Sequence, residues 1–593
     1  MAVYRISTAY DTRVQAAQLA REREHPPHLA NGDEQRWASS NYAMSFTKGL
    51  PHRQSTGMIA DRRDFEAFRR AIDEGFIDAF STSVPVAIGG PTMQPFERRQ
   101  WEAPTAGVTY DLQGPDAQAV TMPPAPALGS AELAYEMAEV YELALLHDVP
   151  FTAFEDGAGN PDVGTSVGRL NALDYDPTDG TGRPRKVNAA GDVSDQTAFR
   201  GASPGVEVGP YLSQFMLIGN DDLRGTSGTD TVASGLIAYG AHTVDQRVAV
   251  AAQTDWMTTR NDWLAVQRGR NVRDNNTLFT SDPRRFITTP RDLATYVHDD
   301  ALYQAYLNAC LILLGMRTPF DAGFAHLAGG RDLFAVQPNN THTTMELQAT
   351  GFALFGGPHI LSLVTEVATR ALKAVRYQKY NVHLRLRPEA LAGRIEYANE
   401  PDVIAECPDA AAAFQELAAS IAPTVAAVQA ANASGSALLP MAFQEGSPMH
   451  PAYGAGHATV AGACVTILKA FFDTDAVFVR RGGRDAFLGK EPGDSPVAYR
   501  PDDTPGALGS SLVPSTDGPF LKLEGELNKL AANISIGRNM GGVHYFTDYY
   551  DSLRMGEAIA IGMLEEQALC YPTDQFVLSV PTFDGKVARI GAR

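Results

Sequence analysis

Three separated segments of this chain carry cations, imidazoles and glycines in a pattern that its fold must bring to one place. The segments are residues 379–388, 450–457 and 538–548. Lysine and arginine donate several N–H groups to the oxygens of a tetrahedral or bipyramidal anion, and one imidazole can bond the central atom. Together the segments supply the candidate site residues Lys379, Arg387, His450, Gly456, His457, Arg538 and His544. The sequence therefore predicts a fold in which distant segments surround one oxyanion.

The overall charge makes such a cationic group conspicuous. The chain has 49 lysines and arginines against 69 aspartates and glutamates, a net charge of −20. Proteins that bind nucleic acid usually carry a basic surface, so we expect no nucleic-acid partner. The cations of the three segments would form a local positive island in a negative protein.

The cysteines and the apolar segments of the chain argue against a cysteine-based metal site, a disulfide-stabilised fold and a membrane protein. The four cysteines (Cys310, Cys407, Cys464 and Cys570) are too widely spaced for a metal knuckle and too few for a disulfide scaffold. The N-terminal residues lack a basic segment followed by an apolar stretch. No uncharged run reads as a membrane span. We expect a cytoplasmic protein without membrane contact.

Apolar residues at helical spacing dominate the chain from about residue 285. Pro423 should kink or divide one of these helices. The predicted helices are 61–74, 130–147, 291–314, 360–376, 409–431, 457–472 and 553–570. Residues 155–210 are rich in Gly, Asp, Pro and Thr and predict a long loop. We therefore predict a mainly α fold, a helical bundle with long irregular loops.

Strand signals are few. Residues 575–585 alternate apolar and polar positions and end in Asp-Gly, which predicts a hairpin. For the domain organisation we expect an N-terminal helical and loop region over residues 1–200, and a helical region over residues 201–593 that carries the three segments.

Glycines at the segments predict how the candidate ligands converge. Gly456 precedes a helix that opens at His457, and a helix N-terminus attracts anions through its free N–H groups. Arg538 and His544 are six residues apart, so on an unbroken helix their side chains would point about 240° apart. Gly541-Gly542 between them should break the helix and let both face one point. Asp548 could then hold the second imidazole nitrogen of His544.

The ordered set of segments resembles the signature shared by vanadium-dependent haloperoxidases and acid phosphatases of the type 2 phosphatidic-acid-phosphatase superfamily. Residues 208–215, 262–267, 292–298 and 583–585 also resemble segments of algal and cyanobacterial vanadium bromoperoxidases. The similarity covers most of the chain from about residue 200 onward. It implies a large helical subunit built on two four-helix bundles that assembles into a homo-oligomer.

The resemblance also implies a role for each candidate. His544 would bond the metal of one vanadate per subunit, with Lys379, Arg387, Gly456 and Arg538 on the equatorial oxygens. His457 would act as acid and base at the apical oxygen, and Lys379 would polarise bound peroxide. Hydrogen peroxide, a halide and a small organic acceptor would be the partners. His450, at the position where bromoperoxidases carry a second histidine, favours bromide and iodide over chloride, and Gln378 would add a polar neighbour near the halide route.

The three segments also allow other interpretations. On the same scaffold an acid phosphatase would use His457 or His544 as nucleophile and general acid. Seven residues separate Lys379 from Arg387, as in algal bromoperoxidases, whereas the phosphatase signature usually has six. Each cation could alone be a solvated surface charge, and His383 reads as a structural residue or as support for the ligands.

Two further features concern ligands. The family normally has Pro-Ser-Gly-His at the anion-binding turn, whereas this chain has Gly454-Ala455-Gly456-His457, so the serine hydroxyl is missing. We therefore expect a weakened vanadate site. Residues 339–348, with the oxygen ligands of Glu346 and Gln348, could bind Ca²⁺ or simply form a solvated loop.

Overall fold

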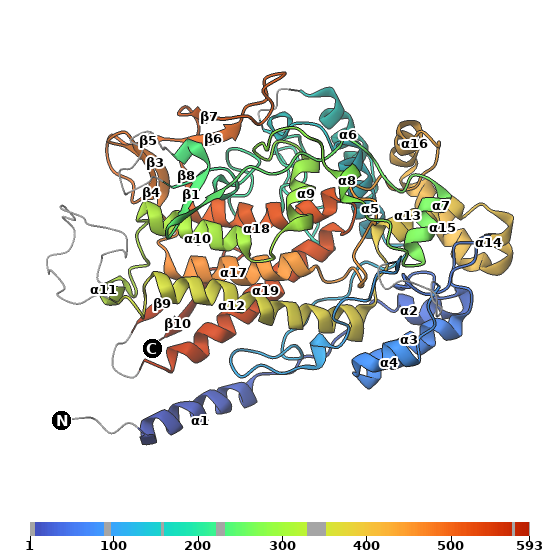
Figure 1. Ribbon diagram of the computed structural model, residues 1–593, viewed down its shortest axis with the longest axis horizontal. Coiled ribbons are helices and arrows are strands. Elements are labelled where there is room, and N and C mark those ends of the chain that lie inside the picture. The colour runs from blue at the N-terminus through green and yellow to red at the C-terminus, as the bar shows by residue number, and fades with distance from the viewer. Residues whose placement is uncertain are drawn as a thin grey trace.

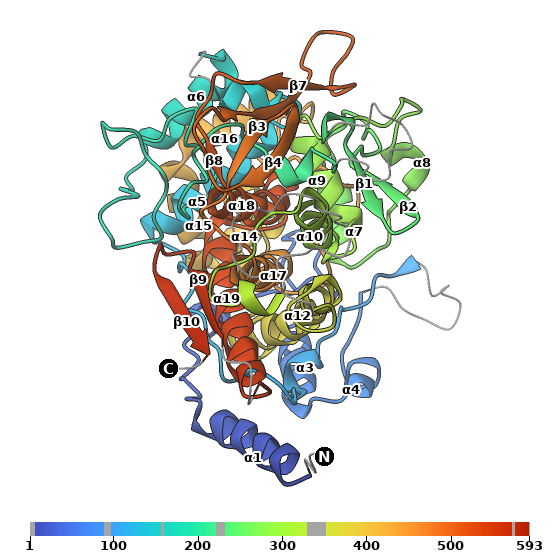
Figure 2. The ribbon, with the colours of Figure 1, turned by 90° about the vertical axis from the view of Figure 1, so that its left-hand side faces the viewer.

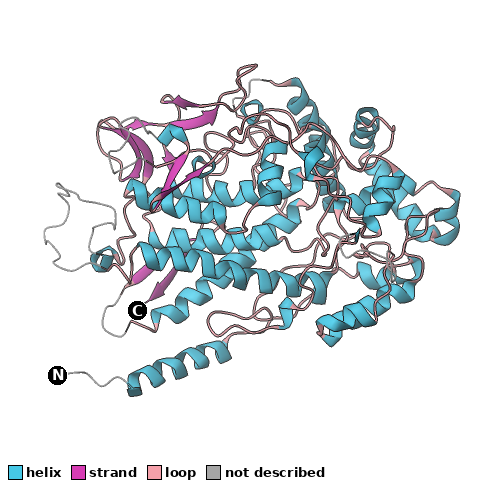
Figure 3. Cartoon of the chain, viewed as in Figure 1, coloured by secondary structure: helices cyan, strands magenta, loops and turns pink. Residues whose placement is uncertain are grey.

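The computed structural model describes residues 6–87, 97–155, 159–220, 232–328, 351–571 and 576–591. Helices form most of the molecule, and the few strands lie at its edges (Figure 3). The mainly helical fold predicted from the sequence is confirmed. The expected calcium segment, residues 339–348, lies outside the described residues.

One helix runs through the centre of the molecule and organises the rest. This helix, α17 (Gly456–Phe471), has every residue buried except His457. It packs against α12 (Gly357–Tyr377), α18 (Leu523–Met540) and α19 (Phe546–Ala568), which form a bundle around it (Figures 1 and 2).

Two glycines allow the closest of these contacts. A Cβ on Gly462 of α17 would lie 2.0 Å from the carbonyl oxygen of Leu553, and a Cβ on Gly556 of α19 would lie 2.0 Å from that of Thr459. Because neither position can hold a side chain, the backbones of α17 and α19 touch directly. The N-terminus of α17 is thereby fixed against the start of α19.

Shorter helices surround this bundle, and most of them pack into one large hydrophobic cluster that runs from Trp37 to Ile590. Their bounds are α1 Ile6–Glu22, α2 Asp33–Arg36, α3 Arg62–Glu74, α4 Ile77–Thr82, α5 Ala131–Leu145, α6 Pro161–Asn171, α7 Arg260–Gln267, α8 Asn275–Leu278, α9 Pro290–Asp299, α10 Gln304–Met316, α11 Ala325–Ala328, α13 Pro388–Tyr397, α14 Pro401–Glu406, α15 Pro408–Ser420 and α16 Ala422–Ala431. Helices α3 and α4 form a second, smaller cluster, and no residue of α1 is buried.

The strands are short and antiparallel. β1 (Leu236–Tyr239) pairs with β2 (His242–Asp245), β6 (Ala498–Pro501) with β7 (Leu512–Ser515), and β9 (Val577–Pro581) with β10 (Val587–Gly591). β3 (Val477–Arg481) lies between β4 (Arg484–Leu488) and β5 (Ser495–Pro496) and also pairs with β8 (Leu521–Lys522). The hairpin predicted at the end of the chain is confirmed, whereas the strands within residues 477–522 were not predicted.

Two local predictions were wrong. Residues 291–314 form two helices, α9 and α10, because Asp300 leaves the helix with extended backbone at φ −73° and ψ 151°. Residues 155–210 contain helix α6, which is capped by the side chain of Asn160 and begins at Pro161. The division expected at Pro423 is confirmed, since α15 ends at Ser420 and α16 begins at Ala422.

Across the described residues no single helix is long and apolar enough to cross a membrane; one bent pair, α15 with α16, passes by length and composition.

Candidate oxyanion site

Arg387 joins all three sequence segments at one buried point. Its Nε donates to the carbonyl oxygen of His450 at 2.9 Å, and its Nη1 donates to that of Val543 at 2.6 Å. Its Nη2 lies 2.7 Å from Nδ1 of His450, and its Nη1 lies 3.0 Å from Nε2 of His544. The convergence that the sequence predicted for residues 379–388, 450–457 and 538–548 is therefore present.

Local backbone breaks aim these side chains. Lys379 lies in a π-helical turn, Gln378–His383, that continues α12, and Leu384 ends this turn in the left-handed region at φ 43°. Arg387 directly precedes α13, whose first residue is Pro388. α18 ends at Met540, and Gly542 adopts a φ of 76° before α19 begins at Phe546, so His544 projects from the break as the Gly-Gly pair predicted.

The cations in this site have no carboxylate within ion-pair distance among the described residues. Lys379 Nζ donates to the carbonyl oxygens of Pro451 and Ala452 at 2.7 and 3.0 Å. Arg538 Nη1 donates to the carbonyl oxygen of Val297 at 2.7 Å, and its buried Nε has no hydrogen-bond partner in the described structure. Buried charges are normally paired, so this group of cations fits an anion that completes it.

The pKa shifts agree with that reading. Burial and the neighbouring Arg387 hold the pKa of Lys379 well below its usual value. Burial lowers the pKa of Arg387 to about 9, and it also lowers the pKa of Arg538. Burial is the main cause of all three shifts, and a bound anion would stabilise the charged form of each group.

His544 has the hydrogen bonds of a metal-binding histidine. Its Nδ1 lies 2.7 Å from Oδ2 of Asp548, which accepts a proton but cannot donate one when ionised. The network therefore assigns the proton to Nδ1 and leaves a lone pair on Nε2, which faces Arg387. Burial and Arg387 hold the pKa of His544 well below its usual value, so the imidazole stays neutral. A neutral imidazole with a free lone pair fits the metal atom of vanadate.

The N-terminus of α17 supplies a second contact surface for an anion. Ala455 is its N-cap residue and provides no side-chain hydrogen bond to the first turn. A Cβ on Gly456 would meet only Leu372 Cδ2, at 3.8 Å, so packing within the protein does not require glycine there. Free N–H groups and the helix dipole favour an oxyanion at this end.

The two remaining candidate histidines also have carboxylate partners. His457 Nε2 lies 2.9 Å from Oδ1 of Asp300. Burial lowers the pKa of His457, and Asp300 opposes this shift. His450 Nε2 lies 3.5 Å from Oε2 of Glu102, and burial with the surrounding cations holds the pKa of His450 well below its usual value.

Sequence reasoning missed Asp300 because it expected a continuous helix there. The break between α9 and α10 is what lets Asp300 reach His457. Sequence reasoning also missed Arg385, which donates to Asp548 at 2.7 Å. One signal for Arg385 existed, since it lies two residues before Arg387 and so on the same side of an extended segment.

Gln378 and His383 lie in the same π-helical turn as Lys379, and both have hydrogen-bond partners in the structure. Gln378, expected near the halide route, uses its amide nitrogen on Nδ1 of His28 at 3.1 Å and on the carbonyl oxygen of Val120 at 3.2 Å. His383 contacts Gln378 Oε1 at 3.2 Å and packs edge-on against Tyr453. The contacts of Gln378 thus lie toward the N-terminal region, whereas His383 contacts Tyr453 of the second segment.

Comparison with known proteins places this geometry in a family. Residues 425–569 match the family described as the VCPO second helical-bundle domain. The chain is 41% identical to the vanadium-dependent bromoperoxidase of Corallina officinalis over 99% of its own length and 98% of that protein. It is 31% identical to the vanadium-dependent bromoperoxidase of Ascophyllum nodosum, over 98% and 92% of the two chains.

A solved structure supports the same assignment. The homohexameric second vanadate-dependent bromoperoxidase of Ascophyllum nodosum superposes with a TM-score of 0.77 at 26% identity, covering 99% of this chain and 90% of that one. The full-length similarity agrees with the buried cationic site built from the three segments. The chain belongs to the vanadium-dependent bromoperoxidases.

Proposed function

We propose that this protein binds vanadate among Lys379, Arg387, Arg538 and His544 and uses hydrogen peroxide to oxidise bromide. The observation that carries the proposal is a set of buried cations with no carboxylate partner among the described residues, one of which, Arg387, lies 3.0 Å from the unprotonated Nε2 of His544. The family relationship supports the reaction type, and it does not favour the phosphatase alternative.

Each residue would have a definite task. Lys379, Arg387, Arg538 and the N–H of Gly456 would hold the oxygens of vanadate, and Nε2 of His544 would bond the metal. When bound, vanadate supplies a Lewis acid that draws charge from peroxide. His457, kept neutral by burial and oriented by Asp300, would take up and return protons at the bound anion. Lys379 would also polarise the peroxide.

The hypohalous acid formed would leave and halogenate a small organic acceptor. The predicted preference for bromide and iodide over chloride rests on His450, which Arg387 holds at 2.7 Å. Chloride turnover equal to bromide turnover at neutral pH would contradict this preference.

The decisive experiment measures bromide oxidation by peroxide as vanadate is added to the vanadate-free protein. Hydrolysis of a phosphate ester is measured in parallel. We expect activity that saturates with vanadate and is inhibited competitively by phosphate. Bromination without vanadate, or none at any vanadate concentration, would overturn the proposal.

The role of His544 has its own test. His544→Ala should abolish stoichiometric vanadium binding, because its Nε2 is the unprotonated imidazole nitrogen that lies beside Arg387 in the site. Lys379→Ala should keep part of the metal and lose peroxide activation. Vanadium retained at one atom per subunit in His544→Ala would show that another group bonds the metal.

We also propose a homo-oligomer whose contacts include α1. No residue of α1 is buried, and the helix projects away from the body (Figures 1 and 2). Ile6, Tyr10 and Val14 follow one another at helical spacing and are 63%, 67% and 44% exposed. A second copy of this chain is the occupant that the homohexameric neighbour suggests.

Light scattering tests this assembly. The double variant Tyr10→Glu, Val14→Glu should lower the oligomer mass, whereas Gln15→Glu, on the opposite side of α1, should not. An unchanged mass in the double variant would exclude α1 from the contact. The cytoplasmic location expected from the sequence is tested separately by cell fractionation.

A further inference from the structure

A buried carboxylate from the N-terminal region lies behind the histidine of the oxyanion site. Glu136 belongs to α5, and its side chain is fully buried. Its Oε2 accepts hydrogen bonds from the backbone N–H of Thr547 at 3.2 Å and from Oγ1 of Thr547 at 2.8 Å. Its Oε1 pairs with the guanidinium of Arg385. Glu136 thus contacts two residues that are hundreds of positions away in the sequence.

Arg385 connects Glu136 to the carboxylate beside His544. Its Nη2 pairs with Glu136, and its Nη1 donates to Oδ1 of Asp548 at 2.7 Å and to Oγ1 of Thr547 at 2.9 Å. The guanidinium lies over the ring of Tyr545 at 4.1 Å. It also lies over the ring of Tyr453, at 5.7 Å, so Arg385 has two carboxylate partners and two aromatic neighbours that determine its position.

Asp548 completes the chain of contacts. Its Oδ2 accepts from the backbone N–H of Tyr545 at 3.1 Å and from Nδ1 of His544 at 2.7 Å. The ordered series is Glu136, Arg385, Asp548 and His544. Each link is a charge-assisted hydrogen bond, and such bonds are short and directional.

We propose that Glu136 is a positioning residue for vanadate binding, which acts through Arg385 and Asp548 to hold the imidazole of His544 ready for the metal. Without Glu136, Arg385 would draw on Asp548 alone and weaken its bond to His544 Nδ1–H. The outer partners of a metal-bound histidine set its orientation and its basicity. This inference rests on the proposed vanadate site.

Electrostatics alone predicts the opposite effect on vanadate affinity when the charge of Glu136 is removed, and this difference gives a test. Removal of one negative charge near three cations should tighten the binding of any anion. A positioning role should instead weaken vanadate, which takes a bond from His544, and should spare phosphate, which fills the same cationic site without that bond. The ratio of the two affinities therefore separates the two effects.

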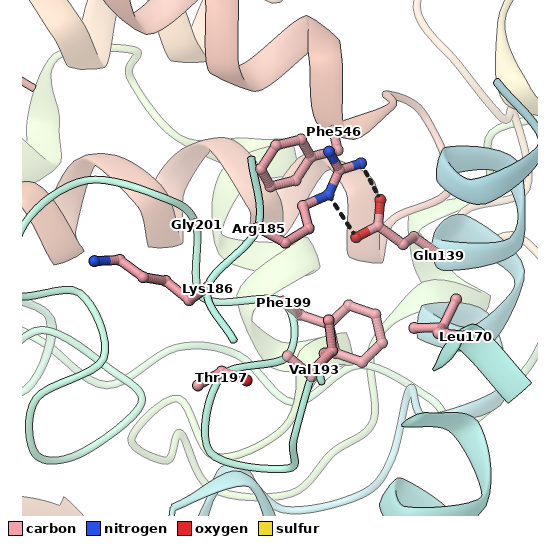
Figure 4. A pocket seen from close by; sticks show the side chains of 10 residues that line it. Glu139, Leu170, Arg185, Lys186, Val193, Thr197, Phe199, Gly201 and Phe546 are labelled. Carbon is pink, nitrogen blue, oxygen red and sulfur yellow. Dashed lines mark hydrogen bonds and ion pairs between the residues drawn. The ribbon is translucent and has the colours of Figure 1, made fainter. Parts of the chain in front are cut away.

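The same helix offers a matched control. Glu139, three residues after Glu136 on α5, forms a buried pair with Arg185 at 3.0 and 2.6 Å. Figure 4 shows this pair, with Arg185 also beside Phe546 at the start of α19. In the described structure Glu139 makes no hydrogen bond or ion pair with Arg385 or Asp548, so Glu139→Gln removes a similar buried ion pair without breaking the series of contacts that ends at His544.

The experiment measures the dissociation constants of vanadate and phosphate by calorimetry for wild type, Glu136→Gln and Glu139→Gln. Burial raises the pKa of Glu136 to about 7, against the effect of Arg385, so the measurement is made at pH 8.5. We expect Glu136→Gln to weaken vanadate by roughly 10- to 100-fold, with phosphate unchanged or tighter. Glu139→Gln should leave the ratio of the two constants at its wild-type value.

An equal change for both anions in Glu136→Gln, or an equal change of the ratio in Glu139→Gln, would overturn the proposal. If Glu136→Gln does not fold, Arg385→Lys replaces it, since lysine keeps the charge but loses the two-sided bridge; the same selective loss is expected, and an unchanged ratio refutes the role. All readouts are binding constants. Failure of the bromide assay would therefore contradict the proposed function, while the binding constants could still be compared between the variants.

Discussion

Two groups of buried or half-buried cations differ in how their charge is balanced in this protein. We call Lys379, Arg387 and Arg538 the unpaired cations, because in the described structure they donate to carbonyl oxygens and to no carboxylate. We call Arg183, Arg185 and Arg385 the paired arginines. Their carboxylate partners are Glu132, Glu136, Glu139, Asp548 and Asp551.

The difference appears in the pKa values. Burial opposes the charged form in both groups. Around the paired arginines the carboxylates outweigh burial and raise the pKa of Arg183, Arg185 and Arg385 above its usual value. Around the unpaired cations burial prevails and lowers the pKa of each. The paired arginines thus have their counter-charges within the folded chain, whereas the unpaired cations would receive theirs from a bound anion.

The largest expected effect comes from removing the charge of Arg385, compared with removing that of Arg387 two residues later. Arg385→Met would leave Glu136 and Asp548 as unpaired buried carboxylates, and we expect it to lower the free energy of unfolding by about 3–5 kcal/mol. Arg387→Met removes an unbalanced charge and should cost much less stability. Urea unfolding of both variants without anion checks this. Equal losses would remove the distinction between the two groups.

Anion binding should stabilise the protein through the unpaired cations alone. At 100 times its dissociation constant, phosphate or vanadate should raise the free energy of unfolding by about 2.7 kcal/mol, because it binds only the folded state. Thermal unfolding at constant ionic strength measures this gain. The gain should persist in Glu139→Gln and should shrink strongly in Arg387→Met. A stabilisation that survives in Arg387→Met would place the anion elsewhere.

Ala455 provides a way to strengthen the site. It is buried at the N-cap of α17 and has no hydroxyl to offer. A hydrogen bond to a charged group contributes about 1.5–3 kcal/mol, so Ala455→Ser should tighten vanadate binding by roughly one to two orders of magnitude. Titration of the vanadate-free variant measures the change. Unchanged affinity would show that the hydroxyl is dispensable here.

The smallest effect concerns pH near the paired arginines. Burial, together with Arg385, lowers the pKa of His383 to about 3, so the native state keeps this imidazole neutral. Below the unfolded pKa of about 6.5, the unfolded state binds a proton that the native state refuses, and stability falls with pH until about pH 3. At pH 5 the loss is about 2 kcal/mol relative to pH 7.5.

His383→Gln should remove this part of the acid sensitivity. Urea unfolding at pH 7.5 and pH 5 for wild type and variant gives the difference. If both lose the same stability on acidification, His383 is not the group responsible.

How far sequence reasoning reached differs between the two groups. The unpaired cations lie next to features that are visible in the sequence, namely glycine breaks, a helix start and unusual cation spacing. The structure brings these residues together as predicted. The paired set could not be predicted, because Glu136 reads as an ordinary helix residue of an amphipathic segment. Only the tertiary fold places Glu136 beside Arg385.

The break between α9 and α10 is a similar case. Apolar periodicity runs through residues 291–314 without a glycine or proline, so local propensity favours one helix. The chain leaves the helix at Asp300, whose carboxylate meets His457, so a tertiary contact overrides the local preference. The strands within residues 477–522 are two to five residues long, too short to show a clear alternation.

The contacts of Arg387 with all three segments have a consequence for how the protein is made. A nascent chain emerging from the ribosome holds Lys379 and Arg387 long before His544 exists. Until residues 538–548 have been synthesised, the site lacks His544, the proposed metal-bonding group, and Arg538, one of its cations. Vanadate uptake must therefore follow almost complete synthesis and long-range docking. Vanadate cannot serve as a template for the early stages of folding, and its capture reports that the last helices are in place.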